Sequence, residues 1–225
     1  MPFAPTPGNP PGAAHTLAMA TCDEPMLCAL TPREQHEYDA LPHETRRRDW
    51  LAGRCAAKRA VGERWGMTAD RIELTSVADA APQVSVRTQI GCWSPLPGRL
   101  TLSHRDGVAI AVAFGSTAAI GVDVERAGDV SPVEVRYFLS EDERMRRQDI
   151  DATVVWVLKE AAWKALGLTA DRPLSSLQLV FRDGASELIA VRYGKGEIRA
   201  HAAVSHIDAT RPLIAAVVQI TPEAS

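Results

Sequence analysis

The order of the elements that the hydrophobic pattern predicts is roughly repeated along the chain. Each half offers a helical stretch followed by strands, although the residues themselves show no repeat. In the first half we expect a helix at 44–65 and strands at 71–77, 84–89, 99–104 and 107–114, and a further strand at 118–125 follows them. In the second half we expect helices at 132–139, from Ser140 onward and at 151–166, and strands at 177–181, 187–193, 197–206 and 213–220. This order predicts an α+β fold.

The composition is that of a globular protein, and it excludes several other classes. Hydrophobic residues make up 46% and charged residues 24% of the 225 residues, so the chain can build a core and is not disordered throughout. No stretch approaches the ~18 consecutive apolar residues that a membrane span needs. The net charge of −3 argues against a general nucleic-acid coat protein. We therefore expect neither a membrane nor a nucleic acid as a partner.

The cysteines and the N-terminal segment indicate a cytoplasmic protein. The chain has four cysteines that share no CxxC spacing, Cys22, Cys28, Cys55 and Cys92. We expect four free thiols in a reducing cytoplasm. Residues 1–14 contain five prolines and no Lys or Arg, so they lack the basic start and the apolar run of a secretory signal. We expect residues 1–20 to form a flexible, Pro-rich tail.

Two acidic residues share one face of the strand predicted at 118–125. Residues two apart in a strand project to the same side, so Asp123 and Glu125 lie together while Val122 and Val124 face the core. Two carboxylates on a rigid strand are typical of a Mg²⁺ site that also uses water and phosphate oxygens. The alternative is an ordinary half-exposed strand, and this segment alone favours that alternative.

Two further segments carry residues suited to phosphate chemistry. Glu160 and Lys164 are i,i+4 neighbours on the helix predicted at 151–166, where they form either a surface ion pair or a carboxylate and a cation for a phosphate. Ser103 and His104 end a strand and could both donate to phosphate oxygens. A hydrolase triad of Ser103, His104 and Asp106 is the rival interpretation. Adjacent residues of a strand project to opposite faces, which argues against that triad.

The three segments together resemble the 4′-phosphopantetheinyl transferase superfamily, in its longer, Sfp-type branch. The family pattern of a Ser-His strand end, a (V/I)GxDxE strand and a KExxxK helix stands here as 103–104, 120–125 and 159–164. The segment 138–143 resembles the FxxxxE connector between the last two motifs. Residues 50–54, on a helix rich in arginine, resemble the basic helix of bacterial members associated with siderophores and secondary metabolites, such as nonribosomal peptides and polyketides.

The resemblance implies transfer of the 4′-phosphopantetheine arm of coenzyme A to a serine of an apo acyl, peptidyl or aryl carrier protein, with release of 3′,5′-ADP. It implies one Mg²⁺, with Mn²⁺ as an alternative, on three metal ligands, Asp123, Glu125 and Glu160. It implies a catalytic set made of Glu160, Lys164 and His104. It also implies a group that binds coenzyme A, made of Arg46, Arg54, Arg87, Ser103, His104, Lys159 and Lys164. Arg87 is the basic residue of the stretch that replaces the Gly-Lys-Pro-like loop of many members.

The length resembles that of the branch in which two similar halves are fused in a pseudo-twofold arrangement. We therefore expect a monomer with an N-terminal lobe at residues 21–116, a C-terminal lobe at residues 117–225, and an active site in the cleft between them. Two alternatives stay open. One is a module of the same fold that binds coenzyme A or a carrier protein without catalysis. The other is a different Mg²⁺-dependent phosphotransferase, although no Walker-type glycine loop is present.

Overall fold

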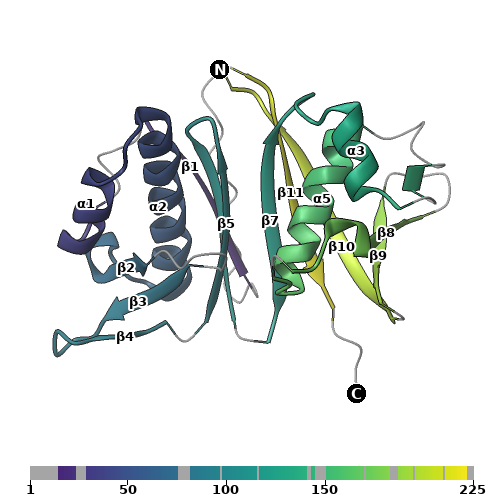
Figure 1. Ribbon diagram of the computed structural model, residues 1–225. Helices are drawn as coiled ribbons and strands as arrows, with labels where there is room; N and C mark the ends of the chain where they lie inside the picture. The colour runs from purple at the N-terminus through teal and green to yellow at the C-terminus, as the bar shows by residue number, and fades with distance from the viewer. Residues whose placement is uncertain are drawn as a thin grey trace.

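Antiparallel sheets form the framework of the protein (Figure 1). The computed structural model describes residues 15–23, 29–75, 82–96, 98–115, 117–140, 143–144, 151–169, 171–182, 187–194, 196–209 and 211–221. Within these residues the first sheet has the order β1 (His15–Thr21), β6 (Val108–Phe114), β5 (Arg99–Arg105). The second has the order β2 (Ile72–Thr75), β3 (Gln83–Arg87), β4 (Trp93–Pro95). The third has the order β7 (Ala119–Arg126), β11 (Leu213–Ile220), β10 (Gly196–Ile207), β9 (Leu188–Tyr193), β8 (Leu177–Phe181).

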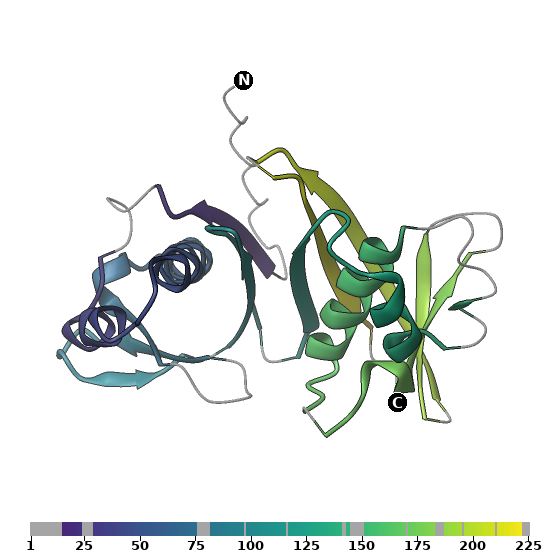
Figure 2. The ribbon, with the colours of Figure 1, turned by 45° about the horizontal axis from the view of Figure 1, so that its top comes forward.

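Helices cover the outer faces of the first and third sheets, which lie side by side with β5 next to β7 (Figures 1 and 2). The helices are α1 (Pro32–Asp39), α2 (Glu44–Trp65), α3 (Pro132–Phe138) and α5 (Ala152–Ala165). Two 3₁₀ turns, η2 (Ala69–Arg71) and η4 (Leu174–Ser176), precede β2 and β8. The long helix α2 packs on β1, β5 and β6, and α5 packs on β7 and β11. The expected α+β class is confirmed.

Strand β6 is buried on both faces, and its alternating residue sizes explain how. Its small residues, Ala109, Ala111 and Ala113, pack under α2, where a helix needs close approach. Its larger residues, Val108, Ile110, Val112 and Phe114, pack with side chains of β7 and β11 between the two sheets. This apolar layer joins the two sheets at the point where β5 and β7 run side by side.

Most predicted elements are confirmed to within two residues, and α2, β8 and β11 match their predicted limits. The expected tail at 1–20 is wrong for residues 15–20, because they belong to β1 and pair with β6. Residues 1–14 of that tail lie outside the described residues, as does Cys28. Cys22, Cys55 and Cys92 form no disulfide. In the described part of the chain no helix is both long and apolar enough to span a membrane.

A buried glutamate–lysine pair ties the start of α1 to α2 and β2. Glu34 closes a capping box with Thr31, the N-cap residue of α1. Its Oε2 lies 2.6 Å from Nζ of Lys58 on α2, and its Oε1 accepts a hydrogen bond of 3.0 Å from the backbone N–H of Leu74 in β2. The Lys58 ammonium also donates to two backbone carbonyl oxygens, so both buried charges are satisfied.

The same arrangement occurs a second time in the second half of the chain. Glu143 closes a capping box with Ser140. Its Oε2 lies 2.7 Å from Nζ of Lys159 on α5, and its Oε1 accepts a hydrogen bond of 2.9 Å from the N–H of Leu179 in β8. Lys159 also donates to the carbonyl oxygens of Phe138 and of a residue in η4. Each helix–turn–strand unit is thus fixed by one buried carboxylate.

We expect Glu143→Ala to lower the free energy of unfolding by about 3–5 kcal/mol, because it leaves the Lys159 ammonium buried and unpaired. The control is Glu197→Ala, which removes a carboxylate that forms an exposed ion pair of 2.6 Å with Arg192. We expect it to lower the free energy of unfolding by about 1 kcal/mol or less. Urea denaturation measures both. Equal losses for the two variants would show that the buried pair has no special role.

Candidate active site

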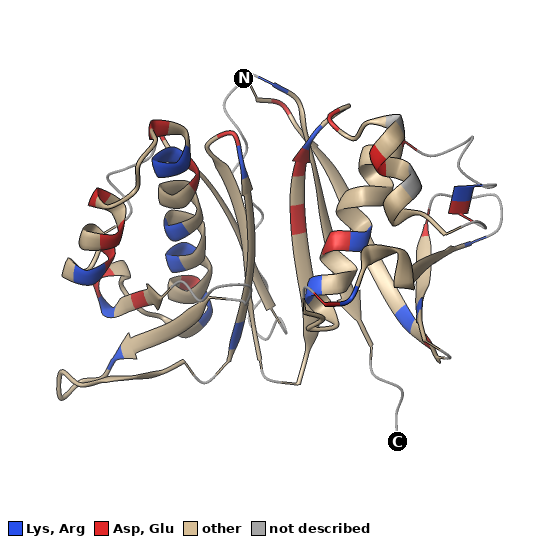
Figure 3. Cartoon of the chain, in the orientation of Figure 1, with Lys and Arg blue, Asp and Glu red and all other residues tan. Residues whose placement is uncertain are grey.

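The close approach of α5 to β7 depends on Gly121. A Cβ atom at this position would collide with the carbonyl oxygen of Ala161 and the amide nitrogen of Ala165, so a side chain cannot fit between strand and helix. The valines that flank position 123 pack into the apolar layer between the sheets. Asp123 and Glu125 therefore project to the opposite face, as the alternation predicts. Figure 3 shows these acidic residues on β7 beside charged residues on α5.

Asp123 is the point at which three of the predicted segments meet. Its carboxylate is buried, and its Oδ1 accepts a hydrogen bond of 2.8 Å from the Ser103 hydroxyl on β5. The same oxygen lies 2.7 Å from Nζ of Lys164 on α5. Lys164 also donates to the backbone carbonyl oxygen of Val122 at 3.1 Å, so its ammonium is held against β7. The structure thus brings together Ser103, Asp123 and Lys164.

Glu125 is held by two arginines at the end of β7. Nε of Arg105 forms an ion pair of 2.9 Å with Glu125 Oε1, and the backbone N–H of Arg126 donates to the same oxygen at 2.8 Å. Burial raises the pKa of Glu125, and the nearby charges of Asp123 and Asp129 add to this rise. The Arg126 N–H and Arg105 act in the opposite direction. From the sequence, Arg105 next to His104 could add a phosphate contact or none, whereas in the structure it contacts Glu125.

Glu160 faces the same region from α5. Burial raises the pKa of Glu160, and the charges of Asp123 and Glu125 raise it further, while Lys164 lowers it. The three predicted metal ligands are therefore close enough to influence one another electrostatically. Within the described residues, however, no group of three or more His, Cys, Asp and Glu side chains could hold a metal ion. The side chains are of the right type for a hard cation, but they are not gathered around one point.

His104 lies against α2, on the face of β5 opposite to that of Ser103. A Cβ atom added to Gly53 of α2 would stand 3.3 Å from Cδ2 of this imidazole, so the helix and the ring are in close proximity. Burial lowers the pKa of His104, and the positive charges of Lys164 and Arg54 lower it further, whereas Asp49 raises it. At neutral pH the imidazole is therefore uncharged, and it can donate one hydrogen bond and accept another.

Lys159 and Arg87 are not brought to this site. The Lys159 side chain is fully buried on the far side of α5, where its protons go to Glu143 and to backbone carbonyl oxygens. Lys159 therefore points away from Asp123, unlike its neighbour Glu160, because adjacent residues on a helix point about 100° apart. Arg87 lies in the second sheet, and its Nε donates to the carbonyl oxygen of Gly91 in its own hairpin.

Arg46 and Arg54, both expected to bind coenzyme A, diverge on α2. Arg46 is exposed near the start of the helix. Arg54 is buried, with its guanidinium 3.1 Å from a carboxylate oxygen of Glu37 and stacked 4.3 Å from the ring centre of Trp50. The structure therefore does not present Arg46 and Arg54 as a joint grip on one phosphate. Arg54 instead links α2 to α1.

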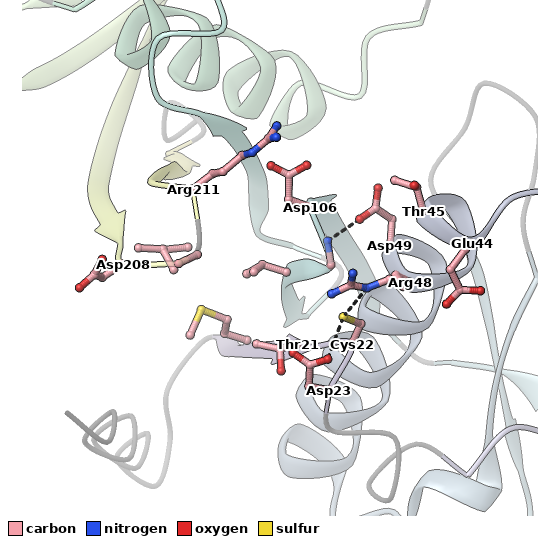
Figure 4. A pocket seen from close by; sticks show the side chains of 15 residues that line it. Thr21, Cys22, Asp23, Glu44, Thr45, Arg48, Asp49, Asp106, Asp208 and Arg211 are labelled. Carbon is pink, nitrogen blue, oxygen red and sulfur yellow. Dashed lines mark hydrogen bonds between the residues drawn. The ribbon is translucent and has the colours of Figure 1, made fainter.

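A cavity of about 540 Å³ lies beside the turn between β5 and β6 (Figure 4). None of the site residues predicted from the sequence lines it. Its lining includes seven charged side chains, Asp23, Glu44, Asp49, Asp106, Asp208, Arg48 and Arg211. This excess of carboxylates disfavours a polyanion. The cavity adjoins the candidate site through Asp106, which forms an ion pair of 2.7 Å with Arg126.

The raised pKa of Glu160 predicts how stability depends on pH without divalent cations. A carboxyl group that binds its proton more tightly in the folded state loses its stabilising contribution as pH rises from about 4.3 through the folded pKa. Glu160→Gln does not ionise, so we expect it to be more stable than the wild type at pH 7 and equally stable near pH 4. Urea denaturation in EDTA measures this, with the exposed Glu63→Gln as control. A difference that does not change with pH would contradict the prediction.

The family match covers the part of this site that β7 and α5 contribute. Residues 119–218 match the model of the 4′-phosphopantetheinyl transferase superfamily. The match spans less than half of the 225 residues, and Ser103 and His104 lie before it. No curated protein matches the chain. From β7 to β11 the chain is thus similar to the 4′-phosphopantetheinyl transferase superfamily.

Proposed function

We propose that this protein transfers the 4′-phosphopantetheine arm of coenzyme A to a serine hydroxyl of an apo carrier protein, with release of 3′,5′-ADP. The family match at 119–218 supports transfer of this group. The observation that carries the proposal is the contact of Ser103 on β5 and Lys164 on α5 with the carboxylate of Asp123. Asp123 and Lys164 lie within the matched residues, whereas Ser103 precedes them, and all three side chains meet at this contact.

The charged residues of the site suit a diphosphate substrate. Coenzyme A is a polyanion, and the oxygens around the attacked phosphorus repel a nucleophile. Lys164, half-exposed beside Asp123, supplies a positive charge for these oxygens. The uncharged His104 and the Ser103 hydroxyl supply hydrogen bonds. The exposed Arg46 is available for a more distant phosphate.

Glu160 is the general base in this proposal. Its carboxylate takes the proton of the carrier serine, whose oxygen forms a bond to the phosphorus of the phosphopantetheine group. The bond from that phosphorus to the oxygen bridging the two phosphates then breaks, and 3′,5′-ADP leaves. A raised pKa makes Glu160 a stronger base than an ordinary glutamate. In the described part of the chain, Glu160 forms no hydrogen bond or ion pair that would block it.

The proposal includes a divalent cation, Mg²⁺ or Mn²⁺, on Asp123, Glu125 and Glu160. Carboxylates are the donors that such ions prefer, and a bound ion would neutralise the charge of the diphosphate. The described arrangement does not gather these donors around one point. Asp123 and Glu125 are instead engaged by cationic side chains of the protein itself. The proton transfer and the phosphate contacts above accordingly use only the residues of the chain.

We also propose a monomer with two lobes in a pseudo-twofold arrangement, the first at 21–116, to which β1 adds residues from His15 onward, and the second at 117–225. The two equivalent networks, Glu34 with Lys58 and Glu143 with Lys159, support this division. Each ties a capped helix start to the following helix and strand. The boundary falls in the connection between β6 and β7, and the site lies where β5 of one lobe meets β7 of the other.

Intact mass spectrometry tests the function directly. The protein is incubated with coenzyme A, Mg²⁺ and a panel of apo acyl, peptidyl and aryl carrier domains. We expect at least one carrier to gain the mass of the phosphopantetheine arm, and a carrier whose acceptor serine is replaced by alanine to gain none. If no carrier gains this mass while a known transferase modifies the same panel, the proposed function is wrong.

Glu160→Gln tests the role of the base. Positioned general-base catalysis contributes typically ~10²–10⁴-fold, so we expect this variant to lower the rate of transfer by at least ~10²-fold. Glu63→Gln makes the same chemical change on an exposed part of α2 and is expected to leave the rate unchanged. Circular dichroism checks that both variants are folded. A Glu160→Gln variant with a near wild-type rate would remove Glu160 from this role.

A further inference from the structure

Arg105 joins the two sheets directly at the edge of the candidate site. It is the last residue of β5, and its side chain reaches across to the end of β7. Its Nε lies 2.9 Å from Glu125 Oε1, and its terminal nitrogen donates to Asp129 at 2.8 Å. Glu125 is thus neutralised by a cation that comes from the opposite sheet.

The ion pair between Arg105 and Glu125 does not include a hydrogen bond from Nε. Nε of Arg105 is buried and has no hydrogen-bond partner among the described residues, although Glu125 Oε1 is only 2.9 Å away. The N–H therefore does not point well at the carboxylate. A charge pair without the hydrogen bond loses much of the strength of a bidentate contact. Arg105 is consequently held more firmly by Asp129 than by Glu125.

The neighbouring Arg126 provides a contrast within the same cluster. Its guanidinium binds Asp106 at 2.7 Å and Asp129 at 3.2 Å, and only its backbone N–H contacts Glu125. Two arginines of equal charge thus share the anion Asp129, but only one of them neutralises the Glu125 carboxylate through its side chain. This difference provides a matched pair for experiment.

Arg105 occupies one of the carboxylates that a metal ion would use, and the described residues contain no cluster that could hold such an ion. A carboxylate that is partly buried needs a compensating charge, because desolvation disfavours the ionised form. Arg105 provides that charge for Glu125, as Lys164 does for Asp123. A divalent cation would supply the same compensation but would need the oxygen that Arg105 now faces. The guanidinium and the ion would also repel each other at a few ångströms.

We propose that Arg105 is a resident counter-ion of Glu125 that a divalent cation must displace, so that this side chain weakens the binding of the cation. The inference rests on the proposed function, because it assumes that Glu125 is a metal ligand. On displacement Arg105 keeps its contact with Asp129, so only its Nε side separates from Glu125.

The test is calorimetric titration of the protein with MnCl₂ and with MgCl₂, without coenzyme A or carrier protein. Removal of one positive charge close to the ion is expected to tighten binding by about tenfold in Arg105→Gln. Arg126→Gln removes the same charge from the same cluster and is expected to change affinity less than about threefold, as is Arg105→Lys, which keeps the charge. Circular dichroism confirms that each variant is folded.

The possible outcomes distinguish a failure of the Arg105 inference from a failure of the proposed function. Tighter binding in Arg105→Gln alone supports the displacement, including the case in which only this variant binds measurably. Equal affinities in all variants, or equal tightening in Arg105→Gln and Arg126→Gln, overturn the inference and leave the metal site in place. If no variant binds either ion, both the inference and the proposed metal fall, whereas the mass assay still decides the transfer reaction. A shift of the Arg105 Nε resonance during titration of the wild type provides a second readout.

Discussion

A buried carboxylate that pairs with a lysine fixes each half of this protein. Glu34 and Glu143 each close the start of a helix, neutralise a lysine on the next helix and accept a backbone N–H from a strand. Such a group is costly to bury unless every partner is present, so it selects one arrangement of helix, turn and strand. The second of these pairs anchors α5 through Lys159 and so determines which side of that helix faces β7. Glu160 and Lys164 therefore lie on the side of α5 that faces Asp123 of β7.

The site follows from this orientation and from one close contact. Gly121 allows α5 to approach β7, and the apolar layer between the sheets brings β5 next to the same strand. The meeting point concentrates carboxylates, and the protein neutralises them with its own cations, Lys164 for Asp123 and Arg105 for Glu125. Asp123 and Glu125 thus have counter-ions without a ligand. In the function that we propose, these internal ion pairs would be exchanged for external ones when a cation or a phosphate binds.

Sequence patterns were sufficient where alternating apolar residues or a helix-ending glycine mark an element. Helix α2 could be predicted to the residue because Gly66 ends it in a left-handed conformation. Strand β1 could not, because its buried positions are small or polar, such as Ala18 and Ala20, and its partner β6 lies about ninety residues away. The alternation in β7 placed Asp123 and Glu125 correctly on one face. The motif did not reveal that Lys159 faces the core, because its partner Glu143 comes from another element. The Arg105 contact with Glu125 joins two sheets and likewise leaves no local pattern.

The central claim is that β7 and α5 form one site for a divalent cation and the diphosphate of coenzyme A. Anomalous diffraction from crystals grown with Mn²⁺ and coenzyme A tests it most directly, because the signal locates the ion without assumptions about its ligands. The claim predicts one manganese peak bound by Asp123, Glu125 and Glu160, with the diphosphate beside Lys164 and Arg105 withdrawn from Glu125. A peak in the acidic cavity, or coenzyme A bound away from β7 while Glu125 remains paired with Arg105, would contradict it.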